Sequence, residues 1–192
     1  NYLQVGGEIE ELAVLASEED AHEEALIEML DEESLRYAGS IVLGLNDALV
    51  ELTGALAGYT LALQNTRLIA LTGLITGIAA ALSMAASEYL STRSEDTDKN
   101  PLKASLYTGA AYILTVAVLI LPYLLFPNYY LCLFLALTAA VVIIAVFNYY
   151  ISVARDEPFR QRFLEMAGVS LGVALFSFGL GYVIRTFLGV DV

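Results

Sequence analysis

The chain is poor in the residues that build disulfide-linked domains and many enzyme sites. It has one cysteine, Cys132, so no disulfide can form within the chain. It has one histidine, His22, which excludes any site that takes two histidines from one subunit. The sequence contains no P-loop, no Rossmann fingerprint and no HExxH motif, and we predict that the protein is not an enzyme.

Basic residues are also scarce, since 9 Lys and Arg face 22 Asp and Glu and leave a net charge of −13. Residues 1–35 hold twelve acids and no Lys or Arg, whereas acids and bases nearly balance in the rest of the chain. Such an acidic segment repels nucleic acid and anionic lipid and attracts cations, which argues against a nucleic-acid partner. The segment also lacks the basic and then apolar order of a signal peptide.

Apolar residues are abundant, at 58% of the chain against 16% charged residues. Soluble domains are nearer half apolar and about a quarter charged. Much of the excess falls in runs of about 20 residues, the length that spans the hydrocarbon core of a bilayer. We predict an all-α integral membrane protein with five transmembrane helices. The predicted spans are about 38–63, 68–90, 102–125, 129–153 and 165–188.

The sequence predicts two domains. Residues 1–35 form an acidic amphipathic helix on the cytoplasmic side, because apolar residues recur at helical spacing between acidic faces. Residues 36–192 form the transmembrane domain. All basic residues except Arg67 and Arg185 flank one set of span ends, and the positive-inside rule makes that side cytoplasmic. The N-terminus is then cytoplasmic and the C-terminus outside, and we expect the prokaryotic plasma membrane.

Glycines recur in pairs at four-residue spacing, which lets helices approach closely in lipid, within one chain or between two copies. The pairs are Gly54 and Gly58, Gly73 and Gly77, and Gly168 and Gly172. An odd number of spans makes a symmetric repeat within one chain difficult. We therefore predict a homodimer, with a transport pathway between its two copies.

Three carboxylates, Asp47, Glu51 and Glu88, fall inside the predicted spans. Asp47 and Glu51 are four residues apart, so they share one helix face. A carboxylate at membrane depth is costly unless it faces a protected cavity or a partner, and such acids commonly mark ion or proton pathways. The alternative is an acid that burial keeps protonated and that bonds a neighbouring helix.

The second predicted span adds a thioether, because Met84 lies four residues before Glu88 on the same helix face. A thioether with a carboxylate suits a transition-metal ion such as Fe²⁺, whereas Ca²⁺ and Mg²⁺ take oxygen ligands. A methionine alone more often fills space in a core. Asn46, beside Asp47, adds a neutral oxygen donor.

A second metal-binding region is predicted on the cytoplasmic side. Glu19 and His22 form an E-x-x-H motif, whose spacing places both residues on one helix face and builds di-iron sites in ferritin-like bundles. We expect these two residues, together with Glu23 and Glu165, to collect metal. The alternative for the motif is a solvated charged face, because chance matches are common in so acidic a stretch.

Three short motifs carry a family resemblance. Residues 44–49 have the sequence GLNDAL, residues 81–91 have ALSMAASEYLS, and residues 163–166 have FLEM. Together they resemble the vacuolar iron transporter family over most of residues 36–188. The resemblance implies a dimer of five-helix subunits that exports Fe²⁺, and often Mn²⁺, from the cytosol in exchange for protons.

In that family, the residues matching Asp47 and Met84 line the pathway, and Glu88 belongs to the same motif. The assignment of Glu51 rests on its spacing alone. The eukaryotic members place a metal-binding helical domain where this chain has only the short loop 91–100. The acidic helix over 1–35 instead resembles the last helix of the ferritin-like (erythrin) domain fused to some prokaryotic members. We expect the remaining helices of that domain upstream, in a longer protein.

The leading hypothesis is proton-coupled export of Fe²⁺ and Mn²⁺, with the metal as substrate and no permanently bound cofactor. A membrane-anchored ferritin-like module that binds or oxidises iron is an alternative, in which Glu19 and His22 matter more than Asp47 and Met84. An uncoupled cation channel is another. Dependence of transport on an imposed pH gradient separates coupled exchange from passive flow.

Overall fold

The computed structural model describes residues 36–95, 98–155 and 158–188. Within these ranges the chain is helical and contains no strand. The helices are a first helix at Arg36–Leu63, α2 (Thr66–Ser94), α3 (Pro101–Leu125), α4 (Tyr129–Arg155) and α5 (Phe159–Leu188). All five are long and apolar enough to cross a membrane, which confirms this part of the predicted fold. The predicted cytoplasmic helix lies outside the described residues, and the homodimer stays a prediction.

Asparagine side chains cap the starts of three helices. The Oδ1 atom of Asn65 accepts hydrogen bonds from the first backbone amides of α2, at 3.1 and 3.2 Å. Asn100 and Asn128 do the same for α3 and α4. Each cap satisfies amides that have no partner within the helix. Only Gln64 and Asn65 separate the first helix from α2, and Gln64 adopts a left-handed φ of 48° in this reversal.

Two helices extend beyond the apolar runs that predicted them. α2 continues to Ser94 rather than ending at 90, and α5 begins at Phe159 rather than 165. The charged segment between the fourth and fifth predicted spans therefore contains the first turns of α5, including Arg160 and Arg162. Hydropathy marks where a helix meets hydrocarbon, but its backbone hydrogen bonds continue into polar surroundings.

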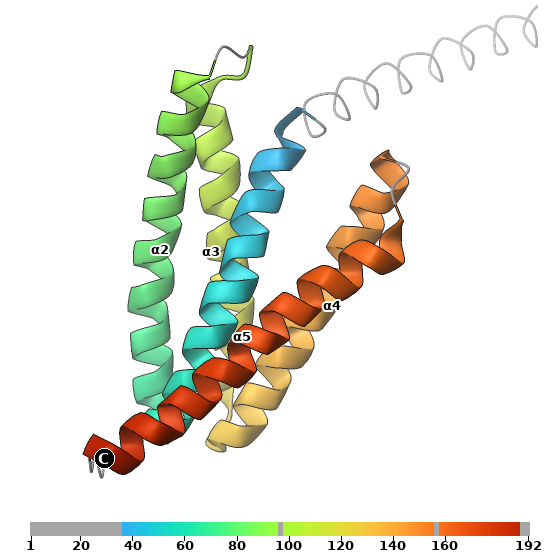
Figure 1. The fold of residues 1–192 in the computed structure, drawn as a ribbon. Coiled ribbons are helices and arrows are strands. Elements are labelled where there is room, and N and C mark those ends of the chain that lie inside the picture. The colour runs from blue at the N-terminus through green and yellow to red at the C-terminus, as the bar shows by residue number, and fades with distance from the viewer. Residues whose placement is uncertain (1–35, 96–97, 156–157, 189–192) are drawn as a thin grey trace, which may run out of the picture. The chain divides into compact units, whose positions relative to one another are not determined.

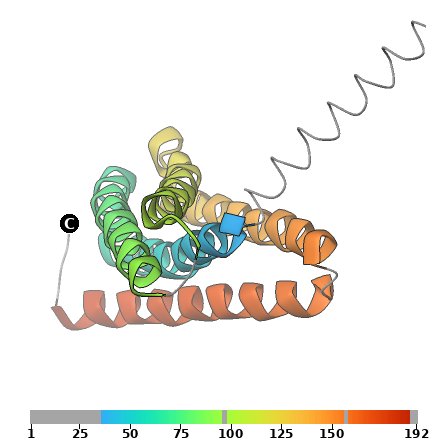
Figure 2. The ribbon, with the colours of Figure 1, turned by 90° about the horizontal axis from the view of Figure 1, so that it is seen from above.

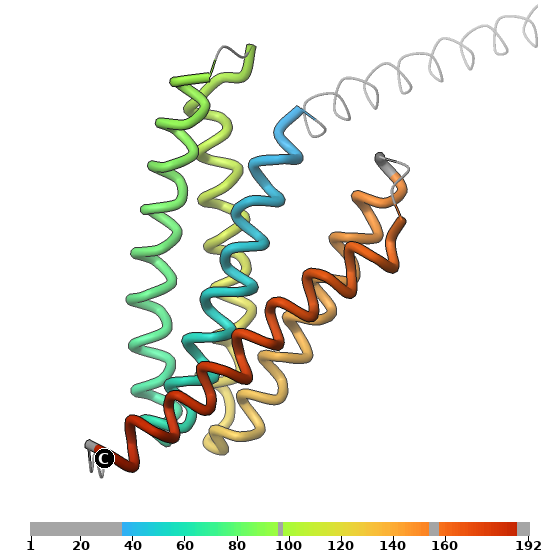
Figure 3. Tube along the Cα trace, in the orientation of Figure 1, coloured from blue at the N-terminus to red at the C-terminus, as the bar shows by residue number. Residues whose placement is uncertain are grey.

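The first helix lies among the other helices of the compact unit that begins at Ser40. Its Ser40 hydroxyl donates to Glu88 of α2 at 2.6 Å, and its Thr60 hydroxyl lies 2.8 Å from Tyr123 of α3. α5 crosses in front of it in Figure 1, and Figure 3 shows the same crossing along the Cα trace. Seen from above in Figure 2, α5 runs along one side of the other helices.

Small residues allow the first helix and α5 to touch at this crossing. A Cβ atom added at Gly181 of α5 would overlap the backbone carbonyl of Gly58, and one at Gly58 would lie 3.2 Å from the carbonyl oxygen of Ser177. Gly54 of the first helix faces Val173 in the same way. The pair Gly54 and Gly58 therefore packs within the chain.

The other two glycine pairs differ from each other. Gly73 and Gly77 of α2 face Ile120 and Val116 of α3, so this pair also packs within the chain. Cβ atoms added at Gly168 and Gly172 of α5 would have no atom within 4 Å among the described residues. Of the three pairs, the one on α5 is open in a single subunit.

Large apolar side chains cover the outward side of α5. Leu175 and Phe176 are each 73% exposed, and Phe187 is 84% exposed. Exposed apolar area on this scale is rare in soluble monomers and is typical of surfaces that meet lipid or another protein. Bulky apolar residues therefore lie both in the buried core, as Leu56 and Ile120 do, and on the outward side of the helices.

Candidate functional site

Two acids of the first helix form a cluster with a tyrosine of α3. The Tyr112 hydroxyl donates to Oε2 of Glu51 at 3.0 Å, and the Tyr112 side chain is fully buried. Asp47, one turn earlier and partly buried, lies near enough to Glu51 for the two side chains to interact. The structure therefore brings together the two acids that the four-residue spacing placed on one face.

This cluster has no basic partner within the described part of the chain. Asp47, Glu51 and Glu88 form no ion pair with any lysine or arginine there. Two neighbouring carboxylates repel each other when both are ionised, and a bound proton or a bound cation relieves that repulsion. The cluster is chemically suited to exchange one for the other.

Glu88 occupies a different level of the bundle. It accepts the hydrogen bond from Ser40, which precedes Asp47 by seven residues, or about 10 Å along a helix axis. Met84 is partly buried and packs against the apolar core. The four predicted pathway residues thus lie at successive levels of the first helix and α2 rather than around one point. No group of three or more His, Cys, Asp or Glu side chains suited to a metal ion occurs within the described ranges.

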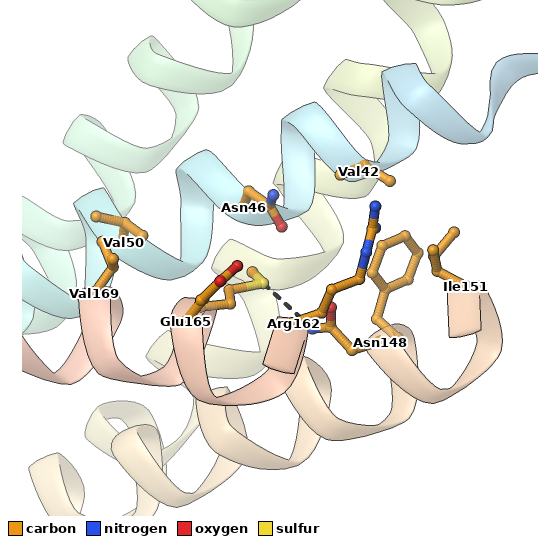
Figure 4. Close-up of a pocket in the computed structure, with 10 residues that line it drawn as sticks. Val42, Asn46, Val50, Asn148, Ile151, Arg162, Glu165 and Val169 are labelled. Carbon is orange, nitrogen blue, oxygen red and sulfur yellow. Dashed lines mark hydrogen bonds between the residues drawn. The ribbon is translucent and has the colours of Figure 1, made fainter. Parts of the chain in front are cut away.

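Asn46 points away from this cluster although it adjoins Asp47. Consecutive helical residues are rotated by about 100°, so Asn46 faces α4 and α5 instead. There it lines a cavity of about 380 Å³, together with Asn148 of α4 and Glu165 of α5 (Figure 4). Glu165 is exposed at this cavity and accepts a hydrogen bond from Gln161 at 3.0 Å. The other predicted metal-collecting residues, Glu19, His22 and Glu23, lie outside the described residues.

Sequence reasoning did not single out Tyr112 or Ser40. The sequence of α3 held a pattern that could have indicated these contacts. Thr108, Tyr112 and Thr115 place hydroxyl groups at helical spacing within an apolar run. Thr108 donates to the backbone carbonyl of Ser40 at 2.9 Å, and Tyr112 donates to Glu51. This hydroxyl-bearing face of α3 marks the side that packs on the first helix.

One short motif has the sequence pattern of a hydrolase nucleophile but not the structural context that the nucleophile needs. Residues 168–172 read GVSLG, which fits the pattern G-x-S-x-G. That pattern carries a nucleophile only on a sharp turn between a strand and a helix. Here Ser170 is buried in the middle of α5, donates to the carbonyl of Leu49 at 2.6 Å and lies 3.1 Å from the Thr53 hydroxyl. Its hydroxyl fastens α5 to the first helix.

Residues 38–98 match the model of the VIT family. The match covers the first helix and α2 and supports membership of that family. It supports the resemblance to vacuolar iron transporters, and the matched segment contains Asp47, Glu51, Met84 and Glu88. The five helices long enough to span a membrane, together with this match, indicate an integral membrane protein, and the match suggests transport of metal. No curated protein matches the chain. The finer resemblance to ferritin-fused members depends on residues 1–35 and stays a prediction.

Proposed function

We propose that this VIT-family protein exports Fe²⁺, and also Mn²⁺, from the cytosol in exchange for protons. The observation that carries the proposal is the Asp47–Glu51 pair, two acids at membrane depth with Tyr112 as a neighbour and no basic partner among the described residues. Intramembrane acids are costly to keep without a function. A carboxylate must be ionised to ligate a metal, so protons and metal compete for the same oxygens.

The exchange follows from that competition. On the cytoplasmic side, Glu88 and then Asp47 and Glu51 receive the metal, with the Met84 thioether favouring a transition-metal ion. Protons from the outer side displace the metal and are carried inward when the site faces the cytosol again. Glu19, His22, Glu23 and Glu165 gather the cation before it enters. The direction follows from the predicted orientation of the basic residues.

The pathway is proposed to lie between two copies of the chain. In a single subunit, Glu51 is exposed at membrane depth, where contact of a carboxylate with lipid is unfavourable. A second copy related by two-fold symmetry would cover this side chain and present its own Asp47 and Glu51 opposite. Such an arrangement doubles the number of carboxylates available to one ion.

Transport by purified protein in liposomes tests the proposal. We expect Asp47→Ala to abolish Fe²⁺ and Mn²⁺ transport and to leave the oligomeric state unchanged in gel filtration. Glu95→Gln is the matched control, because Glu95 is an exposed acid at the end of α2 that bonds only its neighbour Ser91 among the described residues. Near wild-type transport by Asp47→Ala would refute the assignment.

The imposed pH gradient distinguishes the alternatives. Coupled exchange predicts that metal flux rises when the side receiving the metal is made acidic and that protons move in the opposite direction. Flux that depends only on the metal gradient would indicate an uncoupled channel. Loss of iron handling on Glu19→Ala or His22→Ala, with no effect of Asp47→Ala, would instead favour the ferritin-like module.

A further inference from the structure

The cavity between the first helix, α4 and α5 is separate from the pathway residues Asp47, Glu51, Met84 and Glu88, and it shares Glu165 with the proposed cation-collecting acids. It holds about 380 Å³, within the range of small-molecule sites and far larger than a single metal ion needs. Glu165 and Val169 on its α5 wall are both exposed, so the cavity is open to the surroundings (Figure 4).

One wall of the cavity offers an acceptor that has no donor. Asn46 projects from the first helix to the cavity in Figure 4, and its Oδ1 atom is buried with no hydrogen-bond partner among the described residues. Buried polar atoms are almost always satisfied in folded proteins, so an exception calls for a missing partner. By contrast, Asn148 on the α4 wall already donates to the carbonyl of Ile144 and to the sulfur of Met166. The missing partner of Asn46 must bring a hydrogen-bond donor.

The charges of the cavity balance. Arg162 and Glu165 both line it from α5 and lie about one turn apart, so the pair has no net charge. A simple anion or a simple cation would be attracted by one of these groups and repelled by the other. A ligand that carries both charges can pair with both, in addition to the contacts that these two side chains already make. The guanidinium has five N–H donors and can bind more than one acceptor at a time, and the Glu165 carboxylate has acceptor sites beyond the one that Gln161 uses.

The remaining wall is apolar. Val42 and Val50 line it from the first helix, Phe147 and Ile151 from α4, and Val169 from α5. The charged pair lies in the first two turns of α5, where the predicted apolar run begins, which is the level at which lipid head groups meet a transmembrane helix. Paired charges beside an apolar wall at this level match the build of a phospholipid.

We propose that this cavity binds the head group of a phospholipid that ends in a primary amine, such as phosphatidylethanolamine. The phosphate pairs with Arg162, the ammonium group donates to Glu165 and, once the Asn46 side chain turns toward it, to Asn46 Oδ1, and the proximal part of the lipid chains lies along the apolar wall. A choline head group carries the same charges but has no N–H to donate, so it leaves the Asn46 acceptor unsatisfied. The cavity therefore selects the amine over choline. This inference does not depend on the transported ion.

Native mass spectrometry of the purified full chain tests this selectivity. Phosphatidylethanolamine, phosphatidylcholine and phosphatidylglycerol with identical acyl chains compete at equal concentration. We expect one bound phosphatidylethanolamine per subunit, retained about tenfold over phosphatidylcholine, the factor of a single charge-assisted hydrogen bond. Equal retention of these two lipids by the wild-type protein would overturn the proposal without recourse to any variant.

Paired variants locate the site. Asn46→Leu should lose the preference for the amine, and Arg162→Gln should weaken retention of both lipids because both carry the phosphate. Arg160→Gln should change neither, because Arg160 is an exposed arginine of the same helix that does not line the cavity. Gel filtration confirms that each variant is folded. An equal loss of retention in Arg160→Gln would show that binding reflects general surface charge and would overturn the site.

Soluble phosphoethanolamine and Mn²⁺ test whether the cavity binds a water-borne ligand or a cation instead of a lipid. Soluble phosphoethanolamine at the concentration of the lipid should not displace it, since it lacks the apolar part that the valine-rich wall binds. Displacement would assign the cavity to a water-borne ligand. Stoichiometric Mn²⁺ binding that is lost in Glu165→Gln, without any lipid preference, would assign it to a cation. Either result would overturn the lipid proposal.

Discussion

On one side of the first helix, Glu51 accepts a hydrogen bond from buried Tyr112 of α3. On another side, one residue before Asp47, the Asn46 amide lines the cavity toward α4 and α5 and has a buried oxygen without a partner among the described residues. The first side gathers two carboxyl groups with no basic partner in the part of the chain that the structure describes. The second side faces one arginine and one glutamate of α5.

The difference shows how a rotation of about 100° along a helix separates two kinds of chemistry. Adjacent residues in the sequence face different helices, so Asn46 is not a ligand beside Asp47 even though the two are neighbours. Uncompensated charge on one side favours exchange of protons and cations. Balanced charge on the other side favours a ligand that stays bound.

Among the changes that test the difference between the two sides of the first helix, replacing Glu51 by glutamine is expected to have the largest effect. The change removes one of two acids but keeps the shape and the hydrogen bond from Tyr112. We expect metal transport in liposomes to fall by about 10- to 100-fold, a loss of the size expected when a group close to a bound metal is removed. Phosphatidylethanolamine retention should stay at the wild-type level.

A loss of lipid selectivity in Glu51→Gln would break the separation of the two sides. Transport at the wild-type rate would instead show that Asp47 acts alone and that the four-residue spacing has no functional meaning.

The next prediction concerns protein stability and tests the contact between α5 and the first helix. Gly181→Ala should destabilise the protein by about 1–3 kcal/mol, because the new methyl group would overlap the carbonyl of Gly58 and force the helices apart. Gly179→Ala is the control, since a Cβ there meets no atom within 4 Å among the described residues. Thermal unfolding of both variants in the same detergent gives the difference. Equal melting temperatures would contradict the close approach of the two helices.

The smallest effect is expected from Tyr112→Phe, which removes the donor to Glu51 and leaves the ring in the core. The net value of a hydrogen bond to a charged group is about 1.5–3 kcal/mol, reduced here by the exposure of Glu51. We expect a transport rate within about tenfold of wild type and a changed dependence on the pH gradient, because Glu51 loses one of the groups that compete with protons and metal. An unchanged pH dependence would make Tyr112 a packing residue only.

The sequence predicted the five membrane-length helices because the apolar runs are long and are broken by polar turns such as Gln64-Asn65. It placed the start of α5 too late, since Arg160 and Arg162 carry charge but remain helical. Charge marks the membrane boundary and gives no information on where the backbone hydrogen bonds end.

The Asp47–Glu51 contact followed from spacing within one helix, and the structure places the two residues as expected. Contacts between different helices could not be predicted from sequence spacing. The bond from Tyr112 to Glu51 and the cavity lined by Asn46 and Glu165 join residues more than sixty positions apart. A single sequence indicates which face of a helix is polar, but it does not indicate which partner meets that face.

The connection between the first helix and α2 has a mechanical consequence. The two helices are joined at one end by only Gln64 and Asn65, and at the other end by the hydrogen bond from Ser40 to Glu88. Closed at both ends, this hairpin behaves as a stiff lever, and any change of access that opened it would have to break that bond. At the crossing with α5, Gly58 and Gly181 leave no side chains to interlock, but the Ser170 hydroxyl fastens α5 to the carbonyl of Leu49. A change of access that moved α5 against the hairpin would therefore have to break the Ser170 bond, whereas one that opened the hairpin would have to break the Ser40 bond.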